Sequence, residues 1–242
     1  MSTVTAPAVA TVLLWASAAA AASLQVSPVS FDLSAGVKTA QISLQNLGDA
    51  PIDAQIRVFR WSQINGKEQL TPTGDLVASP PAANLAPHQD YIVRLVRIAD
   101  RPVEGEESYR LLVDELPPPL PTNSAVSTVR LFVRYSVPVF FAQPDTSPQL
   151  TWSASIVDQR LQLMVRNDGS QHIRISALRV EGPGLNVSFG EGLVGYVLAH
   201  STAQWTARSV LKSAASGTPL KITALGGNGP VSATALLQTA TH

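Results

Sequence analysis

The four histidines are the first residues to consider for chemistry, because imidazole is both a metal ligand and an acid–base group. His88, His172, His200 and His242 are scattered along the 242-residue chain. No two of them have the H-x-x-x-H spacing of a helical metal site, and none has a carboxylate companion in the sequence. The chain also contains no cysteine. We therefore expect no metal site, no disulfide framework and no thiol nucleophile.

Three other motifs could carry chemistry, and each has a simpler interpretation. Asp114 and Glu115 are adjacent, so on a β-strand their carboxylates point to opposite faces and cannot act as a pair on one substrate unless the strand is bulged. The stretch "GGNGP" (226–230) lacks the Lys-Ser/Thr of a phosphate-binding loop and lies between strand-like runs, which predicts a hairpin turn. "NVS" (186–188) fits the glycosylation pattern as readily by chance as by function, and no serine lies in a nucleophile elbow. We predict that the chain is not an enzyme and has no cofactor.

The overall charge gives no indication of a polyanionic partner. The chain has 17 Lys and Arg residues and 17 Asp and Glu residues, so its formal net charge is zero. Without a net positive field, neither nucleic acid nor an anionic membrane surface is an expected partner.

The N-terminal sequence resembles an export signal. "MSTVTAPAVATVLLWASAAAAASLQV" has an apolar run over 8–22 and ends in three alanines, a small-residue cleavage pattern that leaves Ser23 as the mature start. No Lys or Arg precedes the run. The alternatives to an export signal are an Ala-rich buried helix or a membrane anchor. We predict that 1–22 is a signal peptide. No other stretch is long enough to span a bilayer, so stable membrane insertion is not expected.

The rest of the chain has the pattern of an all-β protein. Short runs of β-branched and aromatic residues recur at intervals of about ten residues and are separated by Gly, Pro, Asn and Asp. This pattern lapses in "AQPDTSPQL" (142–150), which has the composition of a linker. The prediction is two β-sandwich domains, 23–142 and 149–242, joined by a linker at 143–148.

One strand is unusually long. In "STVRLFVRYSVPVFF" (127–141) apolar side chains occupy every second position, and two arginines lie between them. Fifteen residues at about 3.3 Å each would extend roughly 50 Å, well beyond the usual strand of five or six residues. Such a ribbon must overrun its sheet or present an exposed edge, and exposed apolar edges recruit other chains.

Several motifs, in order along the chain, resemble those of a known family. They are "VSPVSFDLSAG", "DLVASPPAANLAPHQDYIVRLVR", "ESYRLLVDELPP", the ribbon itself, "LMVRNDGSQHIRISALRV" and "GYVLAHSTAQWTA". Together they resemble the periplasmic pilus-assembly chaperones of the chaperone–usher pathway, which are PapD-like. The resemblance covers nearly all of the mature chain.

This resemblance implies two immunoglobulin-like sandwiches set at an angle, like a boomerang, and a location in the periplasm. It implies fimbrial or pilus subunits and an outer-membrane usher as partners. The chaperone would bind, fold and cap a subunit by donating its G strand to a groove where the subunit lacks a strand. The donated side chains would be Val129, Leu131 and Val133, with Tyr135 at the border, while Phe132 would face the chaperone's own core.

The sequence departs from the best-known members of this family. The arginine and lysine that anchor the C-terminal carboxylate of a subunit align with Pro28 and Pro138, and a basic residue that braces the domains aligns with Ala142. These departures indicate the archaic, spore-coat-U-type branch. If a carboxylate is still bound, guanidinium groups are the candidates because they bind carboxylates in a bidentate manner, and the candidate anchors are Arg94, Arg110 and Arg134. The alternative for each is an exposed strand arginine.

Other functions are open at this point. A secreted two-domain β-sandwich adhesin or a structural fibre component would share the composition and the export signal. A fibre subunit would, however, carry an extended N-terminal donor segment and lack a last strand. An exported β-rich enzyme is less consistent with a sequence in which no catalytic constellation is found.

Overall fold

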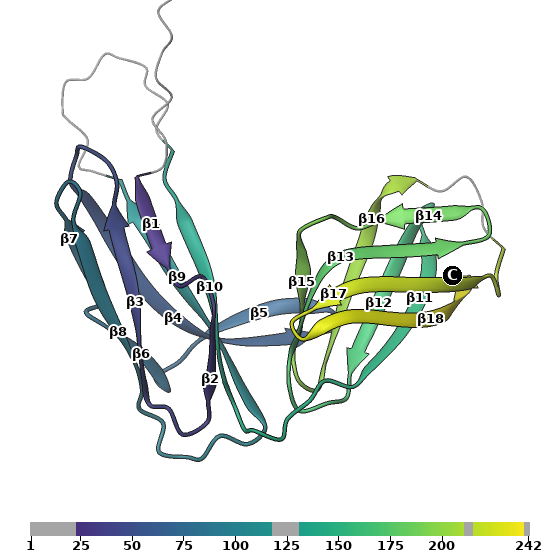
Figure 1. The fold of residues 1–242 in the computed structure, drawn as a ribbon, viewed down its shortest axis with the longest axis horizontal. Helices are drawn as coiled ribbons and strands as arrows, with labels where there is room; N and C mark the ends of the chain where they lie inside the picture. Colours follow the sequence, from purple (N-terminus) through teal and green to yellow (C-terminus); the bar gives the residue numbers. More distant parts are fainter. Residues whose placement is uncertain (1–22, 118–130, 211–214, 240–242) are drawn as a thin grey trace, which may run out of the picture.

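The computed structural model describes residues 23–117, 131–210 and 215–239, and these residues form strands and connecting segments without a helix. Strands β1–β10 build one β-sandwich and strands β11–β18 build a second, and the two meet at an angle (Figure 1). The predicted signal peptide lies outside the described residues. Among the described residues, no helix is long and apolar enough to cross a membrane.

The first sandwich consists of two sheets. One has the order β1-β3-β8-β6 and comprises β1 (Leu24–Ser27), β3 (Thr39–Asn46), β8 (Asp90–Arg97) and β6 (Leu76–Ser79). The other has the order β2-β10-β9-β4-β5, with β7 also paired to β4. It comprises β2 (Phe31–Ser34), β10 (Arg134–Ala142), β9 (Glu106–Leu116), β4 (Ile52–Ile64), β5 (Lys67–Pro72) and β7 (Ala82–Leu85). All neighbours are antiparallel except β2 and β10.

The second sandwich is one continuous set of eight strands folded into two layers (Figure 1). One layer comprises β11 (Leu150–Val157), β12 (Arg160–Asn167) and β16 (Ser201–Val210). The other comprises β13 (Ile173–Gly182), β14 (Leu185–Ser188), β15 (Leu193–Val197), β17 (Pro219–Gly226) and β18 (Gly229–Thr239). Parallel pairing of β11 with β18 joins the two layers.

The expected alternation of apolar residues builds both cores. In β12, for example, Leu161, Leu163 and Val165 are fully buried, while the residues between them face outward or are less buried. The predicted turn in "GGNGP" is confirmed, because Gly226 pairs with Gly229 and leaves a two-residue hairpin loop between β17 and β18.

A buried asparagine closes a loop in each sandwich in the same way. The Asn46 amide, at the end of β3, donates to the carbonyl oxygen of Leu85 at 3.2 Å, and its Oδ1 accepts from the Gly48 N–H. The Asn167 amide, at the end of β12, donates to the carbonyl oxygen of Leu198 at 3.1 Å, and its Oδ1 accepts from the Gly169 N–H. Both asparagines have no exposed surface, so these bonds satisfy groups that would otherwise be buried without partners.

A buried ion pair joins the two sheets of the first sandwich. The Arg97 guanidinium, at the end of β8, donates to both carboxylate oxygens of Glu107 on β9, at 2.8 and 2.9 Å. The Tyr109 hydroxyl donates to the same carboxylate at 2.8 Å. Burial alone would raise the pKa of Glu107, but the hydrogen bonds from Arg97 and Tyr109 lower it below its ordinary value. The pair therefore stays ionised in the interior.

We predict that Glu107→Gln lowers the free energy of unfolding by about 3–5 kcal/mol, because it leaves the Arg97 charge buried without its counter-ion. Denaturant unfolding of the purified variant is the measurement. Glu191→Gln is the matched control, since Glu191 pairs with Arg179 at the surface and its side chain is 72% exposed. That change should cost at most about 1 kcal/mol. Equal costs for the two variants would contradict a structural role for the buried pair.

Candidate binding strand and the junction between the sandwiches

Strand β10 is paired along its whole length on one side only. It pairs with β9 from Arg134 to Ala142, but with β2 only from Val139 to Ala142. Before Val139, the second edge of β10 has no strand partner among the described residues. An unpaired edge of this kind is a template for a strand from another chain.

The hydrogen-bond phase shows which backbone groups face the open edge. The Val133 carbonyl accepts a bond from the Glu115 N–H on the β9 side at 3.0 Å. In an antiparallel pair, every second residue directs its backbone N–H and C=O to the partner strand, here β9. The residues in between direct these groups to the opposite, open edge. These residues are Phe132, Arg134, Ser136 and Pro138. Because Pro138 is in this phase, its missing N–H does not interrupt the β9 ladder, and β10 runs through it without a bulge.

The side chains of β10 form an apolar row that continues past the core. Val137, Val139 and Phe141 are buried in the first sandwich. Tyr135 is in the same phase and half-buried, and its hydroxyl donates to the Leu24 carbonyl at 2.8 Å. Further along this row, Val133 is half-buried and Leu131 is 76% exposed. The row therefore passes from the core into solvent beside the open edge.

Two predictions about the ribbon need correction, and its first four residues, 127–130, lie outside the described residues. The prediction that Phe132 faces the core is wrong, because Phe132 is 44% exposed and has the opposite phase to Val137 and Val139. Leu131 and Val133 are on the core-facing side instead, but ahead of the core. The prediction of one strand over 127–141 is too long within the described residues, because 131–133 precede β10, which begins at Arg134. Val129 lies outside the described residues.

The other face of β10 forms the junction with the second sandwich. The Phe140 ring stacks on His172, just before β13, with 3.5 Å between ring centroids and 8° between planes. Phe140 is also part of a buried cluster with Trp61 on β4, Tyr196 on β15 and Leu198. Aromatic pairs of this kind stabilise by about 0.5–1.5 kcal/mol beyond their burial. The junction is thus a small apolar core shared by both sandwiches.

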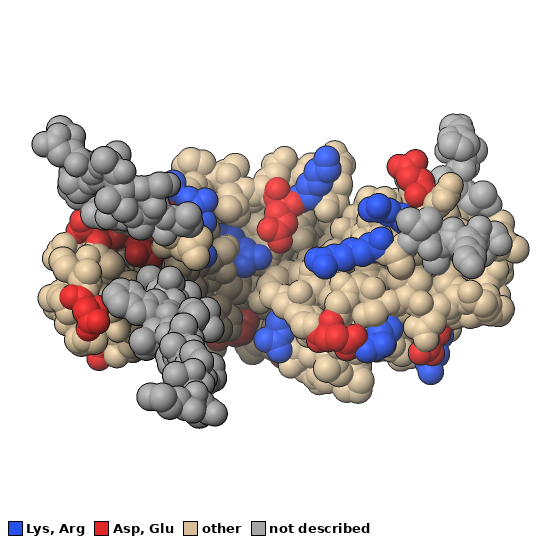
Figure 2. All heavy atoms as spheres, turned by 90° about the horizontal axis from the view of Figure 1, so that it is seen from above, with Lys and Arg blue, Asp and Glu red and all other residues tan. Residues whose placement is uncertain are grey.

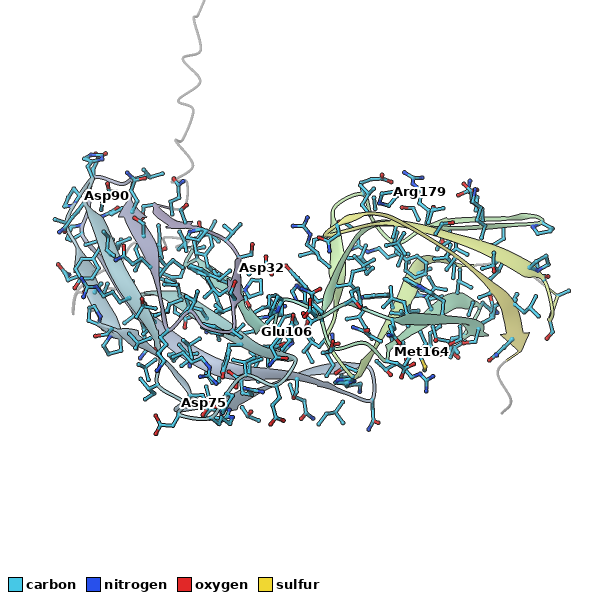
Figure 3. The ribbon with its side chains drawn as sticks, turned by 60° about the horizontal axis from the view of Figure 1, so that its bottom comes forward. Asp32, Asp75, Asp90, Glu106, Met164 and Arg179 are labelled. Carbon is cyan, nitrogen blue, oxygen red and sulfur yellow. The ribbon has the colours of Figure 1, made fainter. Side chains whose placement is uncertain are left out.

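Polar contacts surround this cluster. His172 Nδ1 lies 2.7 Å from Glu106 Oε2, and His172 Nε2 lies 3.6 Å from Asp32 Oδ1. Asp32 and Glu106 both lie where the sandwiches meet (Figure 3). The expectation that no histidine has a carboxylate companion is therefore wrong, because the fold brings Glu106 to His172 across 66 residues of sequence. No group of three or more potential metal ligands occurs within the described part of the chain.

The β4–β5 hairpin reaches across to the second sandwich. The Gln63 side-chain amide donates to the Tyr196 carbonyl at 2.8 Å, and its oxygen accepts from the Leu198 N–H at 2.9 Å. The hairpin turns through Asn65 and Gly66, both with positive φ. "NG" between strand-like runs is a strong hairpin signal, and it could have predicted this element from the sequence.

The comparisons with known proteins identify the family. Residues 23–147, just over half of the chain, match the family described as pili and flagellar-assembly chaperone, PapD N-terminal domain. The chain belongs to this chaperone family. No curated protein sequence matches the chaperone.

Solved structures support the same assignment. The chaperone is 28% identical, with a TM-score of 0.67, to a chain in the CsuC–CsuE chaperone–tip adhesion subunit pre-assembly complex from archaic chaperone–usher Csu pili of Acinetobacter baumannii. This match covers 91% of the chaperone and 100% of that chain. The fold is also shared with the chaperone YadV (17% identity, TM-score 0.62, 89% and 100% covered). A chain in the complex of Salmonella enterica SafA pilin with the SafB chaperone is similar in fold too, with 17% identity and a TM-score of 0.59. This match covers 89% of the chaperone and 98% of that chain. The predicted fold class, all-β with two immunoglobulin-like sandwiches, is confirmed.

The structure separates the three candidate anchoring arginines. Arg94 is exposed on β8, in the sheet that does not contain β10, and Arg134 is exposed and pairs with Asp114. Only Arg110 lies at the junction. Its guanidinium carbon is 3.6 Å from the Trp61 ring centroid and 5.4 Å from that of Tyr196.

Arg110 is nearly buried but still reaches a carboxylate. It is 9% exposed, and burial lowers the pKa of its guanidinium below its ordinary value. The guanidinium lies 3.5 Å from the carboxylate of Glu68 on β5, whose side chain is 52% exposed. An arginine remains charged even with a lowered pKa, so Arg110 is a fixed positive charge between aromatic rings.

A cavity of about 410 Å³ opens beside the junction. It is lined by Phe140 and Tyr196 of the shared cluster, by Asp32 and His172, and by the β17–β18 turn with Asn228. Acidic and basic side chains are mixed on the face shown in Figure 2, in keeping with the zero net charge. The sequence patterns did not reveal the residues that build the junction, namely Trp61, Gln63, Glu106 and Tyr196.

We predict that His172→Ala loosens the arrangement of the two sandwiches. The change removes the ring stacked on Phe140 and takes the ring nitrogen away from Glu106 Oε2, in a side chain with no exposed surface, while Oε1 still accepts from the backbone N–H of residue 172. Unfolding free energy should fall by about 1–3 kcal/mol, and distances between spin labels on the two sandwiches should spread. His88→Ala is the control, because the His88 side chain is 65% exposed and pairs with the exposed carboxylate of Asp49. An unchanged distance distribution in His172→Ala would show that His172 does not hold the sandwiches together.

Proposed function

We propose that this chain is a periplasmic chaperone that captures fimbrial or pilus subunits by donating β10 and then delivers them to an outer-membrane usher. The observation that carries the proposal is the apolar row of Leu131, Val133 and Tyr135 beside an unpaired strand edge. The likeness to a complex of a chaperone with a tip adhesion subunit supports it, as does the likeness to a complex of a chaperone with a pilin.

In the proposed complex the backbone and the side chains of β10 have separate tasks. Outward-facing backbone groups of Phe132, Arg134 and Ser136 would pair with a strand of the subunit, which supplies affinity independent of sequence. Leu131 and Val133 would enter the groove of the subunit, together with Val129 from outside the described residues. Each buried aliphatic side chain contributes roughly 1.5–3 kcal/mol before ordering costs. This is enough to hold a subunit that a competing strand can later displace.

The proposal includes the domain boundaries and the branch of the family. We assign 1–22 to a signal peptide, 23–142 and 149–242 to the two domains, and 143–148 to the linker. The archaic branch is supported by the higher identity to the Csu chain than to the other two structures, and by Pro28 and Pro138 at the usual anchoring positions.

We further assign the binding of the subunit's terminal carboxylate to Arg110, in preference to Arg94 and Arg134. The Arg110 guanidinium is desolvated, and the exposed Glu68 side chain already approaches it at 3.5 Å. A terminal carboxylate that replaced Glu68 would gain a charge-assisted hydrogen bond in a partly dry site. Arg134 is a weaker candidate because Asp114 already neutralises it.

The first test of this function is Leu131→Asp. A charge at this position would enter an apolar groove without a partner, so capture should be abolished. Because Leu131 is 76% exposed in the free chain, unfolding free energy should change by less than about 0.5 kcal/mol. The measurements are the melting transition and the yield of co-purified subunit after co-expression with the secreted fibre protein encoded beside the chain's gene.

Phe132→Asp is the matched control for that experiment. It introduces the same charge one residue away, on the opposite face of the ribbon, and should preserve both folding and capture. Wild-type yield of the fibre protein with Leu131→Asp would exclude strand donation by this segment. Absence of any complex with the wild-type chain would instead favour an adhesin or structural fibre component.

The second test addresses the carboxylate anchor. Arg110→Gln should weaken capture by at least about tenfold, equivalent to about 1.4 kcal/mol, whereas Arg94→Gln should have no effect. A fibre subunit whose terminal carboxylate is replaced by an amide should bind the wild-type chain with the same tenfold loss of affinity. Arg110→Gln should not lower the affinity for this amidated subunit any further. Binding constants for the four combinations form a double-mutant cycle. Additive losses would show that Arg110 and the terminal carboxylate do not interact.

A further inference from the structure

Asp114 on β9 contacts an arginine on each neighbouring strand. Its Oδ2 accepts a hydrogen bond from Arg57 on β4 at 2.7 Å, and its Oδ1 accepts one from Arg134 on β10. Asp114 is 7% exposed, whereas the side chains of Arg57 and Arg134 are 41% and 62% exposed. One buried carboxylate thus ties three adjacent strands together across their outer face.

This contact lies where the ribbon joins its sheet. Arg134 is the first residue of β10, and it is directly opposite Asp114 in the register. The preceding residue, Val133, is held by the neighbour of Asp114. Its carbonyl accepts from the Glu115 N–H at 3.0 Å, and its N–H donates to the Glu115 carboxylate at 3.4 Å.

The two adjacent carboxylates therefore fasten two consecutive residues of the ribbon. Asp114 holds the Arg134 side chain, and Glu115 holds the Val133 backbone. Burial alone would raise the pKa of Asp114, but hydrogen bonds from Arg134 and Arg57 lower it, so the carboxylate stays ionised. Charge-assisted bonds such as these are about twice as strong as neutral ones.

We propose that Asp114 is a positioning residue for the donated strand, which holds the start of β10 extended against β9 before a subunit arrives. This inference rests on the proposed function, because it assumes that Leu131 and Val133 enter a subunit. Without this clamp of Asp114 on Arg134, these residues would have to be ordered during binding, at a cost in free energy that the clamped strand avoids. The clamp would therefore act mainly on the rate of capture and on affinity, and little on global stability.

Hydrogen exchange on the free chain tests the clamp without any subunit. In Asp114→Asn, the β9-facing amides within 131–137, those of Val133, Tyr135 and Val137, should exchange at least about tenfold faster, as expected when the hydrogen bonds to a charged group that hold the strand are lost. Arg134→Gln is the second variant, because it releases β10 but leaves the contact between Arg57 and Asp114. Asp114→Glu should restore part of the protection. The control is Asp168→Asn, which breaks an exposed pair with Arg166 in the second sandwich and should leave 131–137 unchanged.

Capture by the same variants tests the functional consequence. Association with the fibre protein encoded beside the chain's gene should slow by about three- to tenfold for Asp114→Asn and Arg134→Gln, with melting temperatures within a few degrees of wild type. Unchanged exchange over 131–137 in both variants would overturn the inference, as would faster exchange with unchanged capture. If the wild-type chain captures no subunit, the proposed function and the positioning role fail together. The exchange result then reports only whether the clamp exists.

Discussion

The packing of β10 on two different partners is the constraint on which the rest of the structure depends. Val137, Val139 and Phe141 fill the first core, while Phe140, between them, stacks on His172 of the second sandwich. A slip of one residue would exchange these two faces and expose both sets of side chains. The register that fixes the core and the junction therefore also fixes which residues, from Ser136 back to Leu131, lie along the open edge.

The contacts at the junction depend on this register, and they fix how the two sandwiches are placed relative to each other. Three sets of contacts there join the first sandwich to the second: Phe140 with His172, Glu106 with His172, and Gln63 with the backbone of Tyr196 and Leu198. Because several contacts from β4, β9 and β10 converge, no single one needs to be strong to limit rotation. Arg110 lies among the same aromatic rings, so the position of this buried charge depends on the same packing.

The sequence predicted much of the fold because local patterns carry it. Alternation, turn residues and the family motifs were sufficient for two β-sandwiches and for the hairpin at Gly226–Gly229. Period-two alternation also placed Leu131 and Phe132 on opposite faces. The alternation alone does not show which of the two faces packs against the core, because that depends on where the opposing sheet ends. For this reason the prediction that Phe132 faces the core was wrong. The partner of His172 was missed for a similar reason, since Glu106 is close only in the folded chain.

Pro138 shows how a residue that is unfavourable in most strands fits the proposed role. Its missing N–H would weaken a central strand, but here it lies in the phase that faces the open edge, just before β2 begins to pair at Val139. An added strand can therefore form a regular ladder with the residues that precede Pro138 but not continue through it. The strand of a bound subunit would end where the chain's own β2 begins, so the two do not compete for the same backbone. Limiting the added ladder in this way also limits the number of bonds that a displacing strand has to replace. For a carrier that must later release its cargo, a short added ladder is an advantage.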